Sequence, residues 1–356
     1  MASVSLDYDH LVIISLSRMI PNTQYLSTPE TLNGAQETWF VQNLLLGGLA
    51  VSIWDEAGDH SPILSASNIA YLELFGIDSK RIEHIRQLGK KTILIHMGDE
   101  FAKKDISAYG QCDLVLRNYF FPDLFSRADL CDRLVWIPNG FKSGVGPRDP
   151  HSLQPALKRT HLAAFMGWIH NPDSFARERE SFGRMIKSLR KSKENRMTTF
   201  SKWMGRKLHP SSERKAFSSA TLECDDLYLL SSTGFASGNT VGLYAAIMEN
   251  SIFAPCPAGN SPETIRLYDA LESGCIPISL DHLFLRSEQA LGALGPAPFP
   301  ILKSWEELPE FLSKMKKQLQ CEPHAIAELQ TQCITWWSAY KKYIAKHIIT
   351  KIAQIS

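Results

Sequence analysis

Short, unbroken apolar runs alternate with stretches of helical periodicity along most of the chain, and this alternation restricts the possible folds most strongly. Strands that helices cover on both faces give such runs, as in parallel sheets. The alternation therefore predicts the α/β class. The expected strands are 10–16, 49–54, 91–97, 113–116, 134–138, 161–168, 226–232, 252–255 and 276–280. The expected helices are 29–46, 78–88, 172–193, 240–248, 304–319 and 323–352.

The length of the chain and one break in its composition predict two domains. A chain of 356 residues is too long for one ordinary core. Residues 140–155 hold three Gly and three Pro and show no apolar periodicity, which is typical of a linker. We expect α/β domains over 1–145 and 159–330, a linker over 146–158 and a helical end over 331–356. Two such domains predict a ligand in the cleft between them.

The overall composition is that of a globular enzyme and does not call for nucleic acid as a partner. Hydrophobic residues make up 44% and charged residues 21%, with a formal net charge of +1. The seven Cys form no C-x-x-C pair, which favours free thiols in a reducing compartment. The apolar run 11–16 is too short to span a bilayer and lacks a basic leader, so we expect a cytoplasmic protein.

The segment PAGNSPETIRLYDALESGCIPI, residues 257–278, carries the clearest chemical signal. A strand ends at Pro255, a loop leads to Ser261 as a good N-cap, Pro262 suits the first helical position, and Gly274 ends the helix. A loop before a helix N-terminus offers free amide hydrogens and the positive end of a dipole to an anion. The segment therefore predicts a diphosphate site.

Side chains of this segment are assigned to the same ligand. Arg266 can direct a fork of hydrogen-bond donors at the diphosphate. Glu263 and Asp269 have the wrong sign for phosphate and suit ribose or sugar hydroxyls. A plain βαβ unit with a solvated or paired arginine is the alternative. The donor-binding candidates in the segment are Gly259, Asn260, Ser261, Glu263, Arg266 and Asp269.

Three further residues of the second half are weaker candidates. Gly167 ends the expected strand 161–168, where a donor could approach the backbone closely. Arg177 and Arg179 fit either the diphosphate or, more simply, a charged solvent face.

The His residues show no ligand spacing and no D-x-D pair follows a strand, so we expect no obligatory metal.

In the first half, acidic residues follow an expected strand at its carboxyl end, where parallel sheets bind ligands. In HMGDE, residues 96–100, a glycine turn leaves Asp99 and Glu100 as candidates for a base that takes a proton from an acceptor hydroxyl. Asp99 could equally cap a following helix, 101–106. Asp55 and Glu56 are the second choice of base.

Acceptor-binding candidates follow two other strands of the first half. Arg117 and Asn118 come directly after the strand 113–116. Arg117 could hold a phosphorylated acceptor, or pair with a nearby aspartate. Lys142 lies at the expected hinge, where a simple exit turn explains the residues equally well.

The donor segment resembles the signature of the exostosin-like glycosyltransferases, in particular the ribitol-phosphate xylosyltransferase branch. HMGDE, the stretch LRNYF at 116–120 and the stretch IPNGFKSG at 137–144 resemble further blocks of that family in the same order. Asp269 stands where glutamate is commoner in the family. The matching positions are Pro257, Gly259, Ser261, Glu263, Arg266, Leu267, Tyr268, Asp269, Ala270, Gly274, Ile276 and Pro277.

This resemblance implies an inverting enzyme with two Rossmann-like domains, the GT-B arrangement, and a C-terminal helix that packs back on the first domain. The implied reaction moves a sugar, xylose among the candidates, from a UDP-sugar to a glycan, polyol-phosphate or lipid-linked acceptor. Peripheral membrane contact by the basic C-terminal helix is an alternative to packing. A fucosyltransferase-like enzyme that uses a GDP-sugar and a non-catalytic nucleotide-sugar-binding protein are the alternatives for function.

Overall fold

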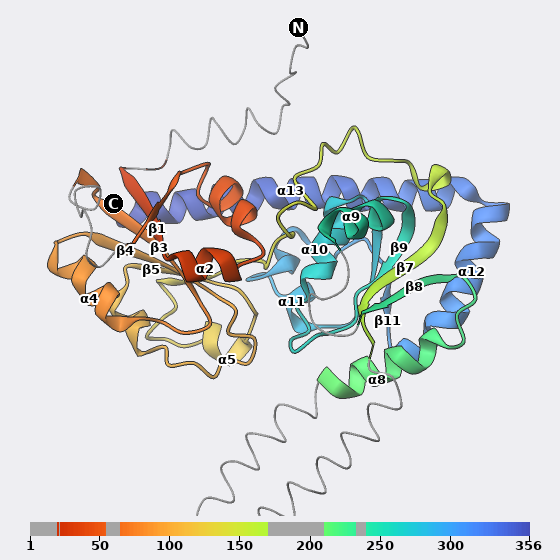
Figure 1. The fold of residues 1–356 in the computed structure, drawn as a ribbon, viewed down its shortest axis with the longest axis horizontal. Coiled ribbons are helices and arrows are strands. Elements are labelled where there is room, and N and C mark those ends of the chain that lie inside the picture. Colours follow the sequence, from red (N-terminus) through yellow and green to blue (C-terminus); the bar gives the residue numbers. More distant parts are fainter. Residues whose placement is uncertain (1–19, 21, 55–64, 170–209, 233–239) are drawn as a thin grey trace, which may run out of the picture.

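Two parallel sheets lie side by side, and one long helix runs along both (Figure 1). The computed structural model describes residues 20, 22–54, 65–169, 210–232 and 240–356. The expected strand 10–16 and the expected helix 172–193 lie outside these residues. All neighbouring strands pair in parallel. The α/β class is therefore confirmed.

The first sheet has six strands in the order β2-β1-β3-β4-β5-β6. Its chain path changes direction between β1 and β3, because β2 pairs on the other side of β1. The strands are β1 (Thr23–Ser27), β2 (Val51–Ile53), β3 (Asn68–Leu74), β4 (Lys91–Met97), β5 (Leu114–Arg117) and β6 (Leu134–Trp136). The helices and helical turns are α2 (Pro29–Gly34), η1 (Phe40–Leu45), α4 (Ser79–Gln87), η2 (Ser107–Gln111) and α5 (Pro122–Phe125).

The second sheet has five strands in the order β11-β10-β9-β7-β8 and changes direction between β7 and β9. Its strands are β7 (His161–Trp168), β8 (Leu227–Ser232), β9 (Ser251–Pro255), β10 (Ile276–Leu280) and β11 (Ile301–Leu302). The helices are α8 (Pro210–Thr221), α9 (Val241–Glu249), α10 (Ile265–Glu272), α11 (Leu283–Arg286), α12 (Leu308–Cys321) and α13 (Pro323–Ile355). Short turns are η3 (Ala156–Lys158), η4 (Leu291–Leu294) and η5 (Trp305–Glu307).

The sequence did not predict β1, β3 and β11, and β3 is the longest of them. β3 carries Asn68 and Glu73, which interrupt the apolar run although both are buried. Glu73 is satisfied there by the Tyr71 hydroxyl and the Asp78 amide. A polar residue inside a strand is stable only with such partners, and only the fold supplies them. β1 has only Tyr25 and Leu26 as apolar residues, and β11 consists of two residues, so neither forms a recognisable apolar run.

The expected helix 29–46 is wrong as one element. It divides into α2 and the π-helical turn η1, with an extended residue, Ala35, between them. The reason is a tertiary contact: the Gln36 carbonyl accepts from the Ser143 amide at 2.8 Å, and the Trp39 amide donates to the Ser143 hydroxyl at 3.1 Å. These bonds hold the chain out of helical register.

The C-terminal helix α13 contacts both halves of the protein. Near its start, Gln330 donates to the Gly274 carbonyl and accepts from the Ala156 amide. At its end, the Ser356 hydroxyl accepts from Asn68 of β3 at 2.7 Å. The helix also packs against η1 and β5. Its inward face is apolar, so burial of that face fixes it along the two sheets.

Trp337 is the central contact of α13 and gives a test of that packing. It is buried, its indole N–H donates to Glu272 at 2.7 Å, and its ring lies 5.8 Å from that of Tyr268. We expect Trp337→Ala to lower the free energy of unfolding by about 3–5 kcal/mol, through a cavity and the loss of one hydrogen bond to Glu272. Thr335→Ala, on the exposed face of the same helix, should change it by less than about 0.5 kcal/mol. Urea unfolding measures both, and equal midpoints would contradict a packing role.

Candidate active site

Two arginines lie at the carboxyl edge of the second sheet, where the chain path changes direction. Arg266, in α10, donates to the Met166 carbonyl at 2.5 Å, and its guanidinium lies 4.2 Å from the centre of the Phe165 ring. Arg214, in α8, donates to the Trp168 carbonyl at 2.9 Å. Among the residues that the structure describes, neither arginine forms an ion pair. The charge of Glu213 acts on Arg214 and that of Asp269 on Arg266, yet neither acid pairs directly with its arginine, so both guanidiniums remain available to an anionic ligand.

The geometry around these arginines depends on glycine. A Cβ atom on Gly167 would lie 2.6 Å from a terminal nitrogen of Arg266. Only a residue without a side chain therefore lets this guanidinium lie along the end of β7. Burial, and then the charge of Arg266, lower the pKa of Arg214 to about 10. An anion between the two guanidiniums would relieve that repulsion.

Helix α8 holds the loop that follows β9. The Ala258 amide donates to the carboxylate of Glu213 at 2.7 Å, and the Ala258 carbonyl accepts from Arg214. The same carboxylate accepts from the indole of Trp305 at 2.9 Å. Gly259 is half-buried in this loop, whereas Asn260 is exposed. The loop is thus fixed before any ligand arrives.

The helix of the donor segment begins later than the sequence predicts. α10 starts at Ile265 after Thr264, so the N-cap assignment of Ser261 is wrong. The Ser261 hydroxyl does accept from the Glu263 amide at 3.3 Å, but within a bend rather than a helix. The physical reason is Glu263, whose side chain is drawn towards the first sheet.

Glu263 is a buried carboxylate, 3% exposed, that binds the first half of the protein. It accepts from the Asn139 amide at 3.0 Å, the Trp136 indole at 3.2 Å and the Phe120 amide at 3.3 Å. The Tyr268 hydroxyl adds a fourth bond at 2.9 Å. Burial raises the pKa of Glu263 to about 7, although these four donors act to lower it. Both oxygens are therefore already bonded in the absence of a ligand.

Asp269 and Glu272, both on α10, bind the chain that leaves the first sheet. Asp269 accepts from the Lys142 amide at 2.7 Å and from the Tyr244 hydroxyl at 3.0 Å. Glu272 accepts from the Arg148 amide at 2.8 Å and from Lys341 of α13. Burial raises the pKa of Asp269 to about 6. The acidic residues of the donor segment thus join the two halves of the molecule.

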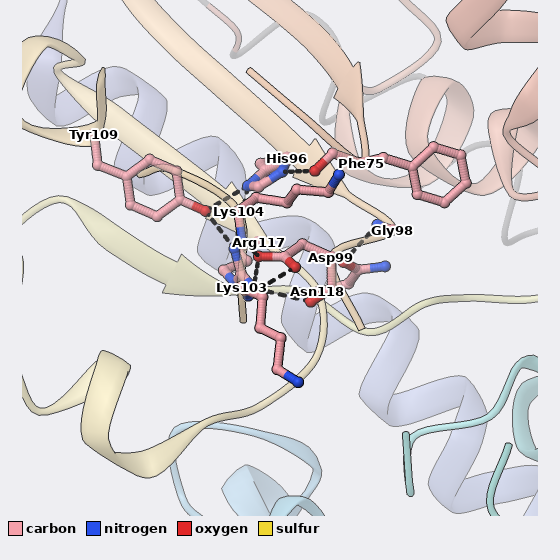
Figure 2. A network of polar contacts seen from close by, with 9 residues as sticks. All are labelled: Phe75, His96, Gly98, Asp99, Lys103, Lys104, Tyr109, Arg117 and Asn118. Atoms are coloured by element: carbon pink, nitrogen blue, oxygen red, sulfur yellow. Dashed lines mark hydrogen bonds and ion pairs between the residues drawn. The ribbon is translucent and has the colours of Figure 1, made fainter. Parts of the chain in front are cut away.

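A buried ionic network lies at the carboxyl end of β4 and β5 (Figure 2). Asp99 is 4% exposed and Arg117 is 1% exposed, and they form an ion pair at 3.0 Å. The other Asp99 oxygen accepts from the Lys103 amide at 3.0 Å. Asp99 therefore caps a turn, as the alternative interpretation expected, although residues 101–106 form no helix. Arg117 is directed at Asp99 and at the hydroxyl of Tyr109.

His96 completes this network. Burial, and then the charge of Arg117, lower the pKa of His96 to about 4, so the imidazole is neutral at pH 7. Its Nδ1 lies 2.6 Å from the Tyr109 hydroxyl and 3.2 Å from an Arg117 nitrogen, which makes Nδ1 the acceptor. The Nε2–H then donates to the Phe75 carbonyl at 3.3 Å.

Asn118 links the first sheet to the donor segment. Its carbonyl oxygen accepts from the Gly98 amide at 3.2 Å, and its amide nitrogen donates to Asn139 at 2.6 Å. Asn139 in turn donates to the backbone carbonyl of Glu263 at 3.0 Å. One line of hydrogen bonds therefore runs from the end of β4 to the start of α10.

Glu100 differs from Asp99 because it is half-buried and has fewer bonds. The Tyr119 hydroxyl donates to it at 3.3 Å. Tyr119 has a φ of 60°, which a side chain rarely adopts. Burial, and then Glu100, raise the pKa of Tyr119 well above its usual value, so the phenol stays protonated. Among the sequence-predicted bases that the structure describes, Glu100 is the more accessible.

Glu37 is an acidic residue of this region that the sequence analysis missed. It is half-buried, and the bonds of its neighbours Gln36, Thr38 and Trp39 to Ser143 fix its backbone. Burial, and to a lesser degree the charge of Asp269, raise the pKa of Glu37 to about 7. No local motif marks it, because its surroundings are made by residues distant in sequence, such as Ser143 and Asp269. Arg214 was missed likewise, as one cation in a long basic stretch.

Some predicted features have no placement. Asp55, Glu56, Arg177 and Arg179 lie outside the described residues. Lys142 is half-buried, and its backbone amide donates to Asp269.

Within the described ranges no group of three or more His, Cys, Asp or Glu residues is arranged to hold a metal ion. No helix in those ranges is long and apolar enough to cross a membrane.

Comparison with known proteins relates the chain to the ribitol-phosphate xylosyltransferase branch. Residues 232–355 match the family described as the RXYLT1 C-terminal domain. Over 192 residues the chain is 23% identical to ribitol-5-phosphate xylosyltransferase 1 of Danio rerio. The aligned region covers 52% of this chain and 36% of the relative. The match thus spans about a third of that protein's length. The resemblance that the sequence motifs indicated is confirmed.

The raised pKa of Glu37 gives a test by pH. A carboxyl group whose pKa rises from 4.5 to about 7 on folding stabilises the fold below pH 4.5 and loses that contribution as the pH rises through 7. Above pH 7.5 the buried charge should cost on the order of 2 kcal/mol. Glu37→Gln removes this cost, so its melting temperature relative to wild type should rise from pH 5 to pH 8. Glu30→Gln, on exposed α2, is the control. A difference that is flat across pH would refute the burial of this charge.

Proposed function

We propose that this chain is an inverting glycosyltransferase of the GT-B type that transfers a sugar from a UDP-sugar. The observation that carries the proposal is the pair Arg214 and Arg266, which form no ion pair within the described ranges and lie beside Gly167 and the loop at Gly259. Two guanidiniums at the change of direction of a parallel sheet suit a diphosphate. The relationship to a protein named a xylosyltransferase supports a pentose such as xylose as the sugar.

In this proposal the diphosphate leaves with its charge stabilised by the two arginines. Developing negative charge on a leaving group is stabilised well by preorganised cations, and these two are fixed by carbonyl bonds before the ligand binds. No metal is required for that role. In the loop Asn260 is exposed and Ser261 is buried, so Asn260 is the one of the two that would contact the same ligand. The acceptor is a glycan or polyol phosphate.

Glu100 is the proposed base. An inverting transfer needs one group to remove the proton of the acceptor hydroxyl while that oxygen attacks the anomeric carbon. Asp99 is less suited, because an arginine and two backbone amides already hold its oxygens. The roles of Arg117 and Asn118 then become indirect: they position the backbone on which Glu100 stands.

Removal of either arginine tests the donor site. Arg266→Ala and Arg214→Ala should each weaken UDP binding by about ten- to a hundredfold, the loss expected for a charge-assisted hydrogen bond. Arg86→Ala, on exposed α4, should leave it unchanged. Calorimetry in EDTA, with GDP and CMP as comparisons, measures affinity, base preference and metal independence together. UDP binding that needs added manganese would defeat the metal-free mechanism, and a preference for GDP would favour the fucosyltransferase-like alternative.

The two neighbouring carboxylates should respond differently to amide substitution. Glu100→Gln should lower kcat by about a hundredfold to ten-thousandfold while UDP affinity and melting temperature stay near wild type. Asp99→Asn should instead lower the free energy of unfolding by about 3–5 kcal/mol, because it leaves Arg117 buried without its counter-ion. Transfer assays and thermal melting separate the two. Normal kcat in Glu100→Gln would move the base elsewhere, and UDP binding without any transfer would indicate a non-catalytic protein.

A further inference from the structure

Phe75 is an exposed aromatic residue at the carboxyl end of β3. Its side chain is 54% exposed, although it follows a strand that is buried almost throughout. β3 borders the point where the chain path of the first sheet changes direction, between β1 and β3. Ligands of open parallel sheets bind outside the carboxyl ends of the strands at such a point. The exposed ring therefore lies where the topology predicts a binding site.

The backbone of Phe75 is held in an unfavourable conformation. Its φ is 69°, and Phe75, Ala102 and Tyr119 are the non-glycine residues with positive φ in the described part of the chain. All three follow neighbouring strands β3, β4 and β5. The Phe75 amide donates to the Met97 carbonyl at 2.8 Å, and its carbonyl accepts from His96. Residues held in this region cost stability and cluster at ligand sites.

The ring lies against Gly98, next to the proposed base. A Cβ atom on Gly98 would lie 2.9 Å from the Phe75 ring, so only glycine lets the ring lie there. Figure 2 shows the ring extending away from the ionic network of His96 and Arg117. Glu100, two residues after that glycine, is half-buried and bonded to Tyr119. An exposed aromatic side chain and an acidic hydrogen-bond acceptor thus share one edge of the sheet.

We propose that Phe75 is the stacking platform of an acceptor subsite for a pyranose ring. The face of an aromatic ring is negative and attracts the positively polarised C–H bonds of the apolar side of a sugar. The hydroxyls on the sugar's edge find an acceptor in Glu100. An acyclic polyol has no such flat apolar side, so the subsite selects a cyclic sugar. The assignment of this sugar as acceptor rests on the proposed transferase function, whereas its binding does not.

Substitution by glycine separates binding from folding. Phe75→Gly removes the ring and also relieves the strain, since glycine adopts φ near 70° freely. This gain offsets the lost packing of the ring on Gly98, so its melting temperature should stay near that of wild type. Its affinity for methyl β-D-galactopyranoside, followed by ligand-observed NMR, should fall by about tenfold, the upper range for an aromatic contact. Phe75→Tyr should keep wild-type affinity. Tyr228→Ala, which removes an aromatic of similar exposure on β8, is the matched control.

Two results would overturn the subsite. They are unchanged pyranoside affinity in Phe75→Gly, and binding of ribitol 5-phosphate without binding of the pyranoside. The UDP affinity of the same samples, measured by calorimetry, tests the transferase proposal independently. Loss of pyranoside binding with intact UDP binding supports the subsite, whereas absence of UDP binding in every protein tested refutes the donor site alone.

Discussion

The carboxylate of Glu263 is the contact on which the arrangement of this protein depends. It comes from the second half of the chain, and three of its four hydrogen-bond donors come from the first half. A buried carboxylate needs nearly all of its lone pairs satisfied, so the loops after β5 and β6 must meet the start of α10 in one geometry. Asp269 and Glu272 repeat this contact further along the same helix. The relative position of the two sheets is thus fixed by three acids on one segment.

The two arginines at the edge of the second sheet are held differently from these acids. Arg214 and Arg266 donate to backbone carbonyls and stack on Phe165, which fixes their position without neutralising their charge. A carbonyl orients a guanidinium but supplies no countercharge. The carboxylates of Glu213 and Asp269 act on these arginines through their charge, but they bond to the Ala258 and Lys142 amides and not to the guanidiniums.

The first sheet shows how a buried network can serve an exposed edge. Arg117 and Asp99 do not reach solvent, yet with His96 and Asn118 they bind the backbone at Phe75, Gly98 and residues 103–104. Several of these turns are strained, and strained backbone persists only when its surroundings over-determine it. Polar residues at a strand end can thus act through the backbone rather than by touching a ligand. The type of a polar residue and its position in the sequence do not show whether it contacts a ligand or holds the backbone.

The sequence by itself determined the α/β class, the bounds of β4, β7 and β10, and the relationship to the xylosyltransferase branch. These follow from local periodicity and from a contiguous motif, which need no knowledge of distant contacts. Three features could not be predicted from the sequence: the strand β3, the division between α2 and η1, and the start of α10 at Ile265. Buried polar residues decide the first, and long-range hydrogen bonds to Ser143 and from Glu263 decide the other two. Glu37 and Arg214 escaped notice for the same reason. A residue's type is local, whereas its burial, its pKa and its partners are properties of the folded chain.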